Sequence, residues 1–217
     1  MSEILYFIKF SEEKYANKLI QNGEIFFNKT KKFANDPNPE RGDKYEGTEW
    51  IDKSKISYIK FTSPAFGERI LNISSESNSE IVQYNHNYLL YSLFAVTQEY
   101  LESIDSFKID ERMIDFGDTA VIIQNPKSFL NSILYELKKQ NISYKYNIVK
   151  YDDFNDKKTN MNPFKKKIEH IHQSEFRIII EKKDDNPKLI SIGSIENYCR
   201  KMSTTDLIES EWKIEYK

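Results

Sequence analysis

Cysteine, glycine and proline are scarce in this chain. Its 217 residues include one Cys and six each of Gly and Pro. The single cysteine, Cys199, excludes an internal disulfide and a zinc site built on cysteines, and it suits a reducing compartment. The sequence contains neither a Gly-rich loop that would cradle a phosphate nor a Gly-x-Ser-x-Gly nucleophile motif.

An excess of charge of either sign is also lacking. Lys and Arg number 32, and Asp and Glu number 34, so the formal net charge is −2. No overall field would draw the protein to nucleic acid or to an anionic membrane. No stretch approaches the roughly 18 apolar residues that span a bilayer, and MSEILYFIKF does not read as a leader. We therefore expect a cytoplasmic protein that makes no membrane contact.

Aromatic residues, by contrast, are abundant. The chain has 14 Tyr and 14 Phe, and 39% of its residues are apolar. This is enough to build a sizeable core, and a length of 217 residues favours one core over two. The sequence has no internal repeat and no long Gly, Ser or Pro linker. We expect a single domain over 1–217.

The alternation of apolar and polar residues predicts an α+β fold. A helix is expected over 11–23, with Ser11 as its cap and Gly23 as its end, and the run YLLYSLFAVT at 88–97 fits either a buried strand or a buried helix. A long polar loop after Phe33 and a polar connection to about 169 separate the regular elements. The remaining predictions are strands at 4–10, 23–28, 56–62, 69–74, 79–84, 119–125, 143–150, 174–182, 188–193 and 212–216, and a helix at 126–141.

The stretch HIHQSEFRIII at 170–180 carries polar residues at every second position. On an extended strand, Gln173, Glu175 and Arg177 would share one face. An amide beside a carboxylate suits cleavage of an N-glycosidic bond, because a fixed carboxylate stabilises the oxocarbenium-like transition state. The alternative is a solvent-facing strand on which Glu175 pairs with Arg177 or a neighbour, an interaction worth about 0–1 kcal/mol.

The order of these segments resembles the ADP-ribosyltransferase fold. The chain has an aromatic strand LYFIKF, a helix ending in Gly23, the segment GEIFFNKTKKF, an acidic loop and a late QSEFRI strand. In that family a first strand carries His or Arg for the adenosine ribose, a second supplies Ser, Thr or Tyr beside the nicotinamide pocket, and a late strand supplies the catalytic Glu, often as Gln-x-Glu. The chain is also similar to a group of uncharacterised bacterial proteins, some of them linked to phage defence and toxin systems.

The resemblance covers mainly 4–50 and 164–181 and implies roles for individual residues. Glu175 would be the catalytic carboxylate, and Gln173 would orient the acceptor. The strand ILYFIKF has no His or Arg, so Tyr6 or Lys9 would hold the ribose or the diphosphate of NAD. The nicotinamide pocket would contain Asn28, Thr30 and Phe33.

The loop ERGDKYEG at 40–47 brings further charged residues together. Arg41 could hold a diphosphate through two hydrogen bonds, and a carboxylate of Asp43 or Glu46 could accept a proton from ribose or substrate. The alternative is a surface turn. The sequence leaves both interpretations open.

Two lysine-rich segments, KTKKF at 29–33 and NPFKKKIEHIH at 162–172, could guide an RNA or DNA strand, although such faces are more often only solvated. His170 and His172, placed on one strand face, could bind a metal with a third ligand such as His86, but His-x-His is a weak pattern and we expect no metal. Around 110–118, Asp110, Asp115 and Asp118 fit turns better than a cation site.

Two functions are compatible with these patterns. The first is an NAD-dependent ADP-ribosyltransferase-like effector, a toxin or defence component in which two small mixed or antiparallel sheets with flanking helices form a central cleft. Its acceptor would be protein, RNA, DNA or water, and an antitoxin or regulatory partner is possible. The second is a non-catalytic module of the same fold that binds a nucleotide or a partner.

Overall fold

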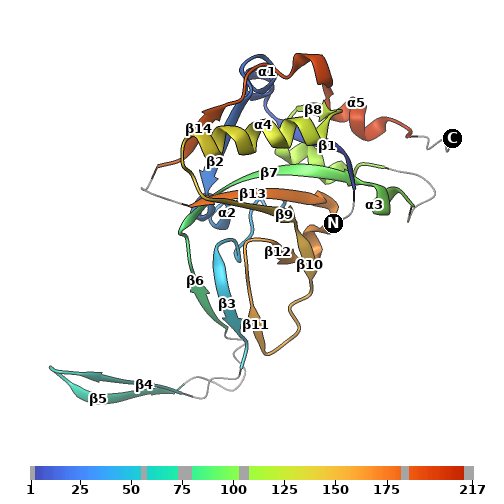
Figure 1. Ribbon diagram of the computed structural model, residues 1–217. Helices are drawn as coiled ribbons and strands as arrows, with labels where there is room; N and C mark the ends of the chain where they lie inside the picture. The colour runs from blue at the N-terminus through green and yellow to red at the C-terminus, as the bar shows by residue number, and fades with distance from the viewer. Residues whose placement is uncertain (1–2, 55–57, 73–79, 103–107, 182–185, 213–217) are drawn as a thin grey trace.

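The computed structural model describes residues 3–54, 58–72, 80–102, 108–181 and 186–212. The α+β class with mainly antiparallel sheets is confirmed (Figure 1). The helices are α1 Glu13–Asn22, α2 Thr30–Ala34, α3 Gln98–Glu102, α4 Pro126–Lys139 and α5 Thr204–Glu209, with 3₁₀ turns η1 Glu111–Phe116, η2 Ile168–Gln173 and η3 Glu196–Tyr198. The strands are β1 Ile4–Ser11, β2 Glu24–Lys29, β3 Thr48–Asp52, β4 Tyr58–Ser63, β5 Gly67–Asn72, β6 Ile81–Tyr84, β7 Tyr88–Thr97, β8 Thr119–Ile123, β9 Tyr144–Ile148, β10 Lys150–Asp152, β11 Lys158–Asn160, β12 Lys165–Lys167, β13 Glu175–Glu181, β14 Lys188–Ser191 and β15 Cys199–Ser203.

Strand β7 is the centre of an eight-stranded sheet. The sheet runs in the order β14-β2-β7-β1-β8-β15, and β13 and then β9 extend it from β7. Strand β13 pairs with Tyr88 to Phe94 of β7 along one edge. Since a strand has two hydrogen-bonding edges, β2 at Leu89–Leu90 and β1 at Phe94–Thr97 must share the other edge. Strands β1 and β2 therefore diverge beside the middle of β7.

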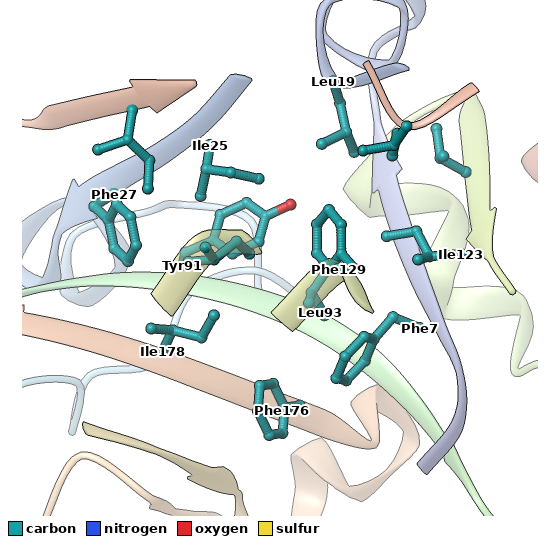
Figure 2. Close-up of a cluster of buried hydrophobic side chains, with 14 of the residues drawn as sticks. Phe7, Leu19, Ile25, Phe27, Tyr91, Leu93, Ile123, Phe129, Phe176 and Ile178 are labelled. Carbon is teal, nitrogen blue, oxygen red and sulfur yellow. The ribbon is translucent and has the colours of Figure 1, made fainter. Parts of the chain in front are cut away.

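Successive side chains of a strand point to opposite faces, so this sheet has a different core on each face. On one face, α1 and α4 pack on β1, β7 and β13, and Figure 2 shows Leu19 of α1 and Phe129 of α4 among the buried side chains. There Phe7 of β1 and Phe176 of β13 meet with ring centroids 4.8 Å apart, and Phe129 of α4 packs beside them. On the other face, Ile8 and Phe94 pack with residues of η1 and α5.

A second, smaller body lies against this other face near β13 (Figure 1). It contains the three-stranded sheet β11-β3-β6, the parallel pair β10-β12 and a small apolar cluster of Tyr45, Ile51, Phe154 and Met161. The β4-β5 hairpin projects away from it. Strands β3, β11 and β12 come from the polar loop and the polar connection, for which the sequence predicted no regular structure, whereas β4, β5 and β6 lie where strands were predicted at 56–62, 69–74 and 79–84.

Most long elements agree with the sequence. Gly23 ends α1 in the left-handed conformation, Pro126 begins α4, and the ambiguous run 88–97 is strand β7. The prediction that Ser11 caps α1 is wrong, because Ser11 is the last residue of β1 and Glu12 occupies the cap position without a side-chain bond. Strands β3, β10, β11, β12 and β15 and helix α5 were not predicted. The strand expected at 212–216 lies, apart from its first residue, outside the described residues.

Candidate functional site

Glu175 and Arg177 point from β13 into a buried contact with the smaller body. The alternate residues Phe176 and Ile178 enter the core under α4, so Glu175 and Arg177 face the opposite way. The prediction that Gln173 belongs to the same strand is wrong. Gln173 ends η2, and Ser174, with φ 37°, turns the chain in the left-handed conformation before β13 begins.

Arg177 is the cation at the centre of this cluster. Its Nη2 donates to Glu46 Oε2 over 2.6 Å and to Glu175 Oε2 over 3.1 Å, and its Nε donates to Glu175 Oε1 over 2.7 Å. The remaining Nη1 donates to the carbonyl oxygen of Pro163 over 2.5 Å. The guanidinium thus ties the loop at Glu46 and the chain before β12 to the central sheet.

The carboxylate of Glu175 has partners on both oxygens. Ser92 of β7 donates its hydroxyl to Oε1, and Lys166 Nζ lies 3.3 Å from Oε2. The backbone N–H of Glu175 donates to the hydroxyl of Tyr151 over 2.9 Å. With an exposed fraction of 6%, Glu175 has its charge met by protein groups and not by water.

Lys166 connects Gln173 to this carboxylate. Its Nζ donates to Gln173 Oε1 over 2.5 Å, and Gln173 Nε2 donates to the carbonyl oxygen of Glu40 over 2.7 Å. Gln173 therefore lies near Glu175 as the sequence predicted, although a buried lysine stands between the two side chains.

The electrostatics follow from burial competing with charge pairing. Burial alone would raise the pKa of Glu175, but Arg177, Lys166 and the hydrogen bonds outweigh it and hold that pKa well below its ordinary value. Glu46 differs: burial raises its pKa, and the nearby carboxylate of Asp43 adds to the effect against the opposing charge of Arg177. Burial would lower the pKa of Arg177, but Glu175 and Glu46 raise it well above the ordinary value.

Lys9 contacts the other edge of β7 on the opposite face of the sheet, where Tyr91 packs under α1 and α4. Where β1 and β2 diverge, its Nζ donates to the backbone carbonyl of Ser92 over 2.9 Å and lies 4.7 Å from the centre of the Tyr91 ring. Burial lowers the pKa of Lys9 to about 8, and the charge of Glu175 opposes this shift. Ser92 therefore contacts Lys9 through its backbone and Glu175 through its side chain.

Other residues that the resemblance implied have different surroundings. Tyr6 packs in the core with Val96, its partner on β7. Thr30 is buried and lies 2.7 Å from His86 Nδ1, and Arg41 is exposed with its Nη2 3.4 Å from Asp36 Oδ1. The remaining two are half-buried: Asn28 accepts from the N–H of Lys29, and the carbonyl of Phe33 accepts from the N–H of Asp43.

The histidines also differ from the expectation. His170 and His172 lie in η2 and not on a strand, with ring centroids 6.5 Å apart. His172 Nδ1 lies 3.2 Å from the carbonyl of Glu169, and its Nε2 lies 3.1 Å from Glu40 Oε2. Asp110 begins η1 and binds Arg112, as expected of a turn residue.

A groove of about 1360 Å³ opens beside the cluster. Tyr151 and Ser174, which adjoin the backbone of Glu175, are among its lining residues. Its other walls come from β7, from 108–114 around η1, from η2 and from α5. The groove therefore reaches the backbone of Glu175, while the carboxylate is turned into the ion-pair cluster.

The sequence analysis did not identify several residues of the Glu175–Arg177 cluster. Ser92 lies inside an apolar run, and Lys166 lies in a lysine-rich segment that appeared solvated. Glu46 was noted only as a loop carboxylate. Nothing local marks these residues, because each meets Glu175 or Arg177 across a wide separation or, for Lys166, across the unpredicted turn η2.

Comparisons with known proteins add no relative. The chain matches no protein-family model, no curated protein and no solved structure. Among the described residues, no helix has both the length and the apolar character to cross a bilayer.

Proposed function

We propose that this protein transfers ADP-ribose from NAD, on an ADP-ribosyltransferase-like fold, with Glu175 as the catalytic carboxylate. The supporting observation is that Ser92 on β7 contacts both Lys9 of β1, through its backbone carbonyl, and Glu175 of β13, through its hydroxyl. A first-strand cation, a serine on a second strand and a late-strand glutamate are the residue types that the resemblance leads one to expect. Ser92 takes the place in which the sequence had suggested Asn28 or Thr30.

The chemistry asks for an ionised carboxylate beside a ribose carbon that becomes cationic as nicotinamide leaves. Arg177 and Lys166 keep Glu175 ionised, since they lower its pKa. Ser92 fixes the orientation of the carboxylate, so that little reorganisation accompanies the reaction. Lys9 would interact with the ribose or diphosphate in place of the family's His or Arg. The acceptor is protein, RNA, DNA or water.

The same cluster imposes a requirement on catalysis. Both oxygens of Glu175 are engaged, so a ribose hydroxyl can reach Oε2 only if the ammonium of Lys166 gives way. Lys166 lies on β12, a three-residue strand in the smaller body. Binding of NAD or of a regulatory partner must therefore displace the Lys166 ammonium from Glu175, and the isolated protein should be a slow enzyme.

Release of nicotinamide tests this proposal. Purified protein is incubated with NAD, with and without cell lysate, and compared with Glu175→Gln, which keeps the side-chain size and removes its charge. Glu181→Gln, at the exposed end of β13, is the matched control. The proposal requires release by the wild type and the control and its loss in Glu175→Gln, with folding verified by circular dichroism. No release by the wild type under any condition would refute it.

Both oxygens of Glu175 are already paired within the protein, and this favours a second candidate, a non-catalytic module that binds a nucleotide or a partner protein. In this case the Glu175–Arg177 cluster is purely structural. Calorimetry with NAD and ADP-ribose distinguishes the two functions. Binding without nicotinamide release, and cellular effects that Glu175→Gln leaves unchanged, would favour the module; toxicity on expression that this substitution abolishes would favour the enzyme.

A further inference from the structure

The groove beside η1 and η2 has an apolar floor. Phe94 of β7, Ile109 and Val149 line it and are buried in the protein. Ile114 and Ile171 also line it, but they are 51% and 56% exposed. Large apolar side chains left open around a groove are typical of a surface that a partner covers.

The charged residues around this floor are predominantly acidic. Among the residues that the structure describes, four carboxylates line the groove against two cations. The Asp110 carboxylate is neutralised by Arg112, whose Nη2 and Nε lie 2.7 and 2.8 Å from its oxygens. Three exposed carboxylates, those of Glu99, Glu111 and Glu209, then stand against the single ammonium of Lys108.

His172 gives the groove wall a second, independent feature. A carbonyl oxygen only accepts, so the contact of Nδ1 with the carbonyl of Glu169 places the ring proton on Nδ1. In the neutral ring Nε2 is then an acceptor, and it lies 3.1 Å from another acceptor, Glu40 Oε2. The His172 side chain is 2% exposed, and no hydrogen bond to Nε2 exists among the described residues. Two neighbouring acceptors favour an external donor beside them, and the Glu40 carboxylate, with its side chain 23% exposed, is the one that such a donor can reach.

We propose that this groove binds a segment of a partner protein in which Arg or Lys side chains stand beside apolar ones. The apolar side chains would cover the floor and the two exposed isoleucines. The cationic side chains would meet the carboxylates of Glu99, Glu111 and Glu209, and one of their N–H groups would donate to Glu40 Oε2 beside His172. Nucleic acid is the wrong chemistry for this groove, because its phosphates would meet the same carboxylates. The inference holds whether or not the protein consumes NAD.

Fluorescence anisotropy with defined probes tests the inference. The probe is a short labelled peptide of alternating Arg and Leu; the comparison probes are the same peptide with Glu in place of Arg, and a single-stranded oligothymidine. The wild type should bind the Arg peptide and neither of the others. Reversing two exposed charges by Glu111→Lys with Glu209→Lys should weaken binding by about tenfold or more at low salt.

A matched variant separates local from global charge effects. Glu181→Lys with Glu196→Lys makes the same change in net charge at exposed positions outside the groove lining, and it should alter the affinity by less than about twofold. His172→Phe should weaken binding by a smaller factor, because it leaves the Glu40 carboxylate in place. The inference is overturned if the Arg peptide does not bind, if the anionic probes bind as well, or if both charge variants have the same effect. None of these outcomes depends on nicotinamide release.

Discussion

Arg177 of β13 and Glu46 of the loop before β3 form an ion pair of 2.6 Å across 131 positions of sequence. Each side chain is 2% exposed. A buried pair of this kind gains little net free energy, because both charges lose their hydration. Removing one residue of the pair nevertheless lowers stability strongly, because the charge of the other residue then stays buried without compensation. The pair therefore fixes where the smaller body sits on the central sheet.

Replacing Arg177 with Met should be strongly destabilising. The substitution keeps much of the side-chain volume but leaves Glu46 and Glu175 as buried, uncompensated carboxylates around it. We expect a loss of about 3–5 kcal/mol in the free energy of unfolding, measured by urea denaturation. Arg41→Met, at an exposed position, should cost less than about 0.5 kcal/mol.

A double substitution tests the ion-pair explanation itself. The double variant Arg177→Met with Glu46→Leu lacks the Glu46 carboxylate that Arg177→Met alone leaves buried and unpaired. The double variant should therefore be less destabilised than the sum of the two single variants, with a coupling of about 1–3 kcal/mol. Strictly additive losses would show that Arg177 acts through packing and not through its charge.

The sequence predicted the strand part of this cluster correctly and for a physical reason. Period-two alternation puts Glu175 and Arg177 on one face whatever lies opposite. It does not say whether that face meets water or protein, and the alternative expectation, a solvent-facing pair, is half right: Glu175 and Arg177 are paired, but buried. The partners Ser92 and Glu46 come from distant segments, and local pattern carries no signal for such contacts.

Three of the unpredicted strands share a second cause. Strands β10, β11 and β12 have three residues each, and they lie in lysine- and asparagine-rich sequence. Such short strands form because tertiary contacts hold them, as Lys166 shows by its bonds to Gln173 and Glu175. Longer segments such as β7 and α4 contain apolar residues in a clear pattern, and the sequence analysis identified them as regular elements.

Acid should weaken the protein partly through Glu175. Its pKa in the folded protein lies well below the ordinary value of 4.5, so the folded state binds fewer protons than the unfolded chain in acid. The stabilisation is fully present above the unfolded pKa and is lost as the pH falls through the folded one. The difference in unfolding free energy between the wild type and Glu175→Gln should therefore shrink below about pH 4.5. A constant difference from pH 7 to pH 3 would contradict the lowered pKa.

Lys9 should also make stability rise with pH, but in base. Its pKa of about 8 in the fold lies below its ordinary value of 10.5, so the unfolded chain binds more protons between these two pH values. The stability of the wild type should rise with pH across this window relative to Lys9→Met, which has no titrating group at the position. Urea unfolding of both proteins from pH 7 to pH 11 measures the difference. A flat difference would mean that the amine is as well solvated in the fold as in the unfolded chain.

Gly23 should be far less replaceable than a neighbouring glycine of similar conformation. It ends α1 with φ 61°, and its N–H donates to the carbonyl of Leu19 over 2.9 Å. A Cβ at this position would overlap the carbonyl oxygen of Gly193 and lie 2.6 Å from Ile192 Cγ1. Gly193 has φ 81°, but a Cβ there would meet nothing within 4 Å.

The two alanine variants therefore separate backbone strain from collision. Gly193→Ala carries only the cost of the left-handed conformation, about 1–2 kcal/mol. Gly23→Ala carries that cost and must also push the backbone at Gly193 away from α1, so its free energy of unfolding should fall by at least about 1 kcal/mol more. Urea denaturation of both variants measures the two losses. Equal losses would mean that the loop at Gly193 yields freely, and that α1 is not held against it as closely as the structure indicates.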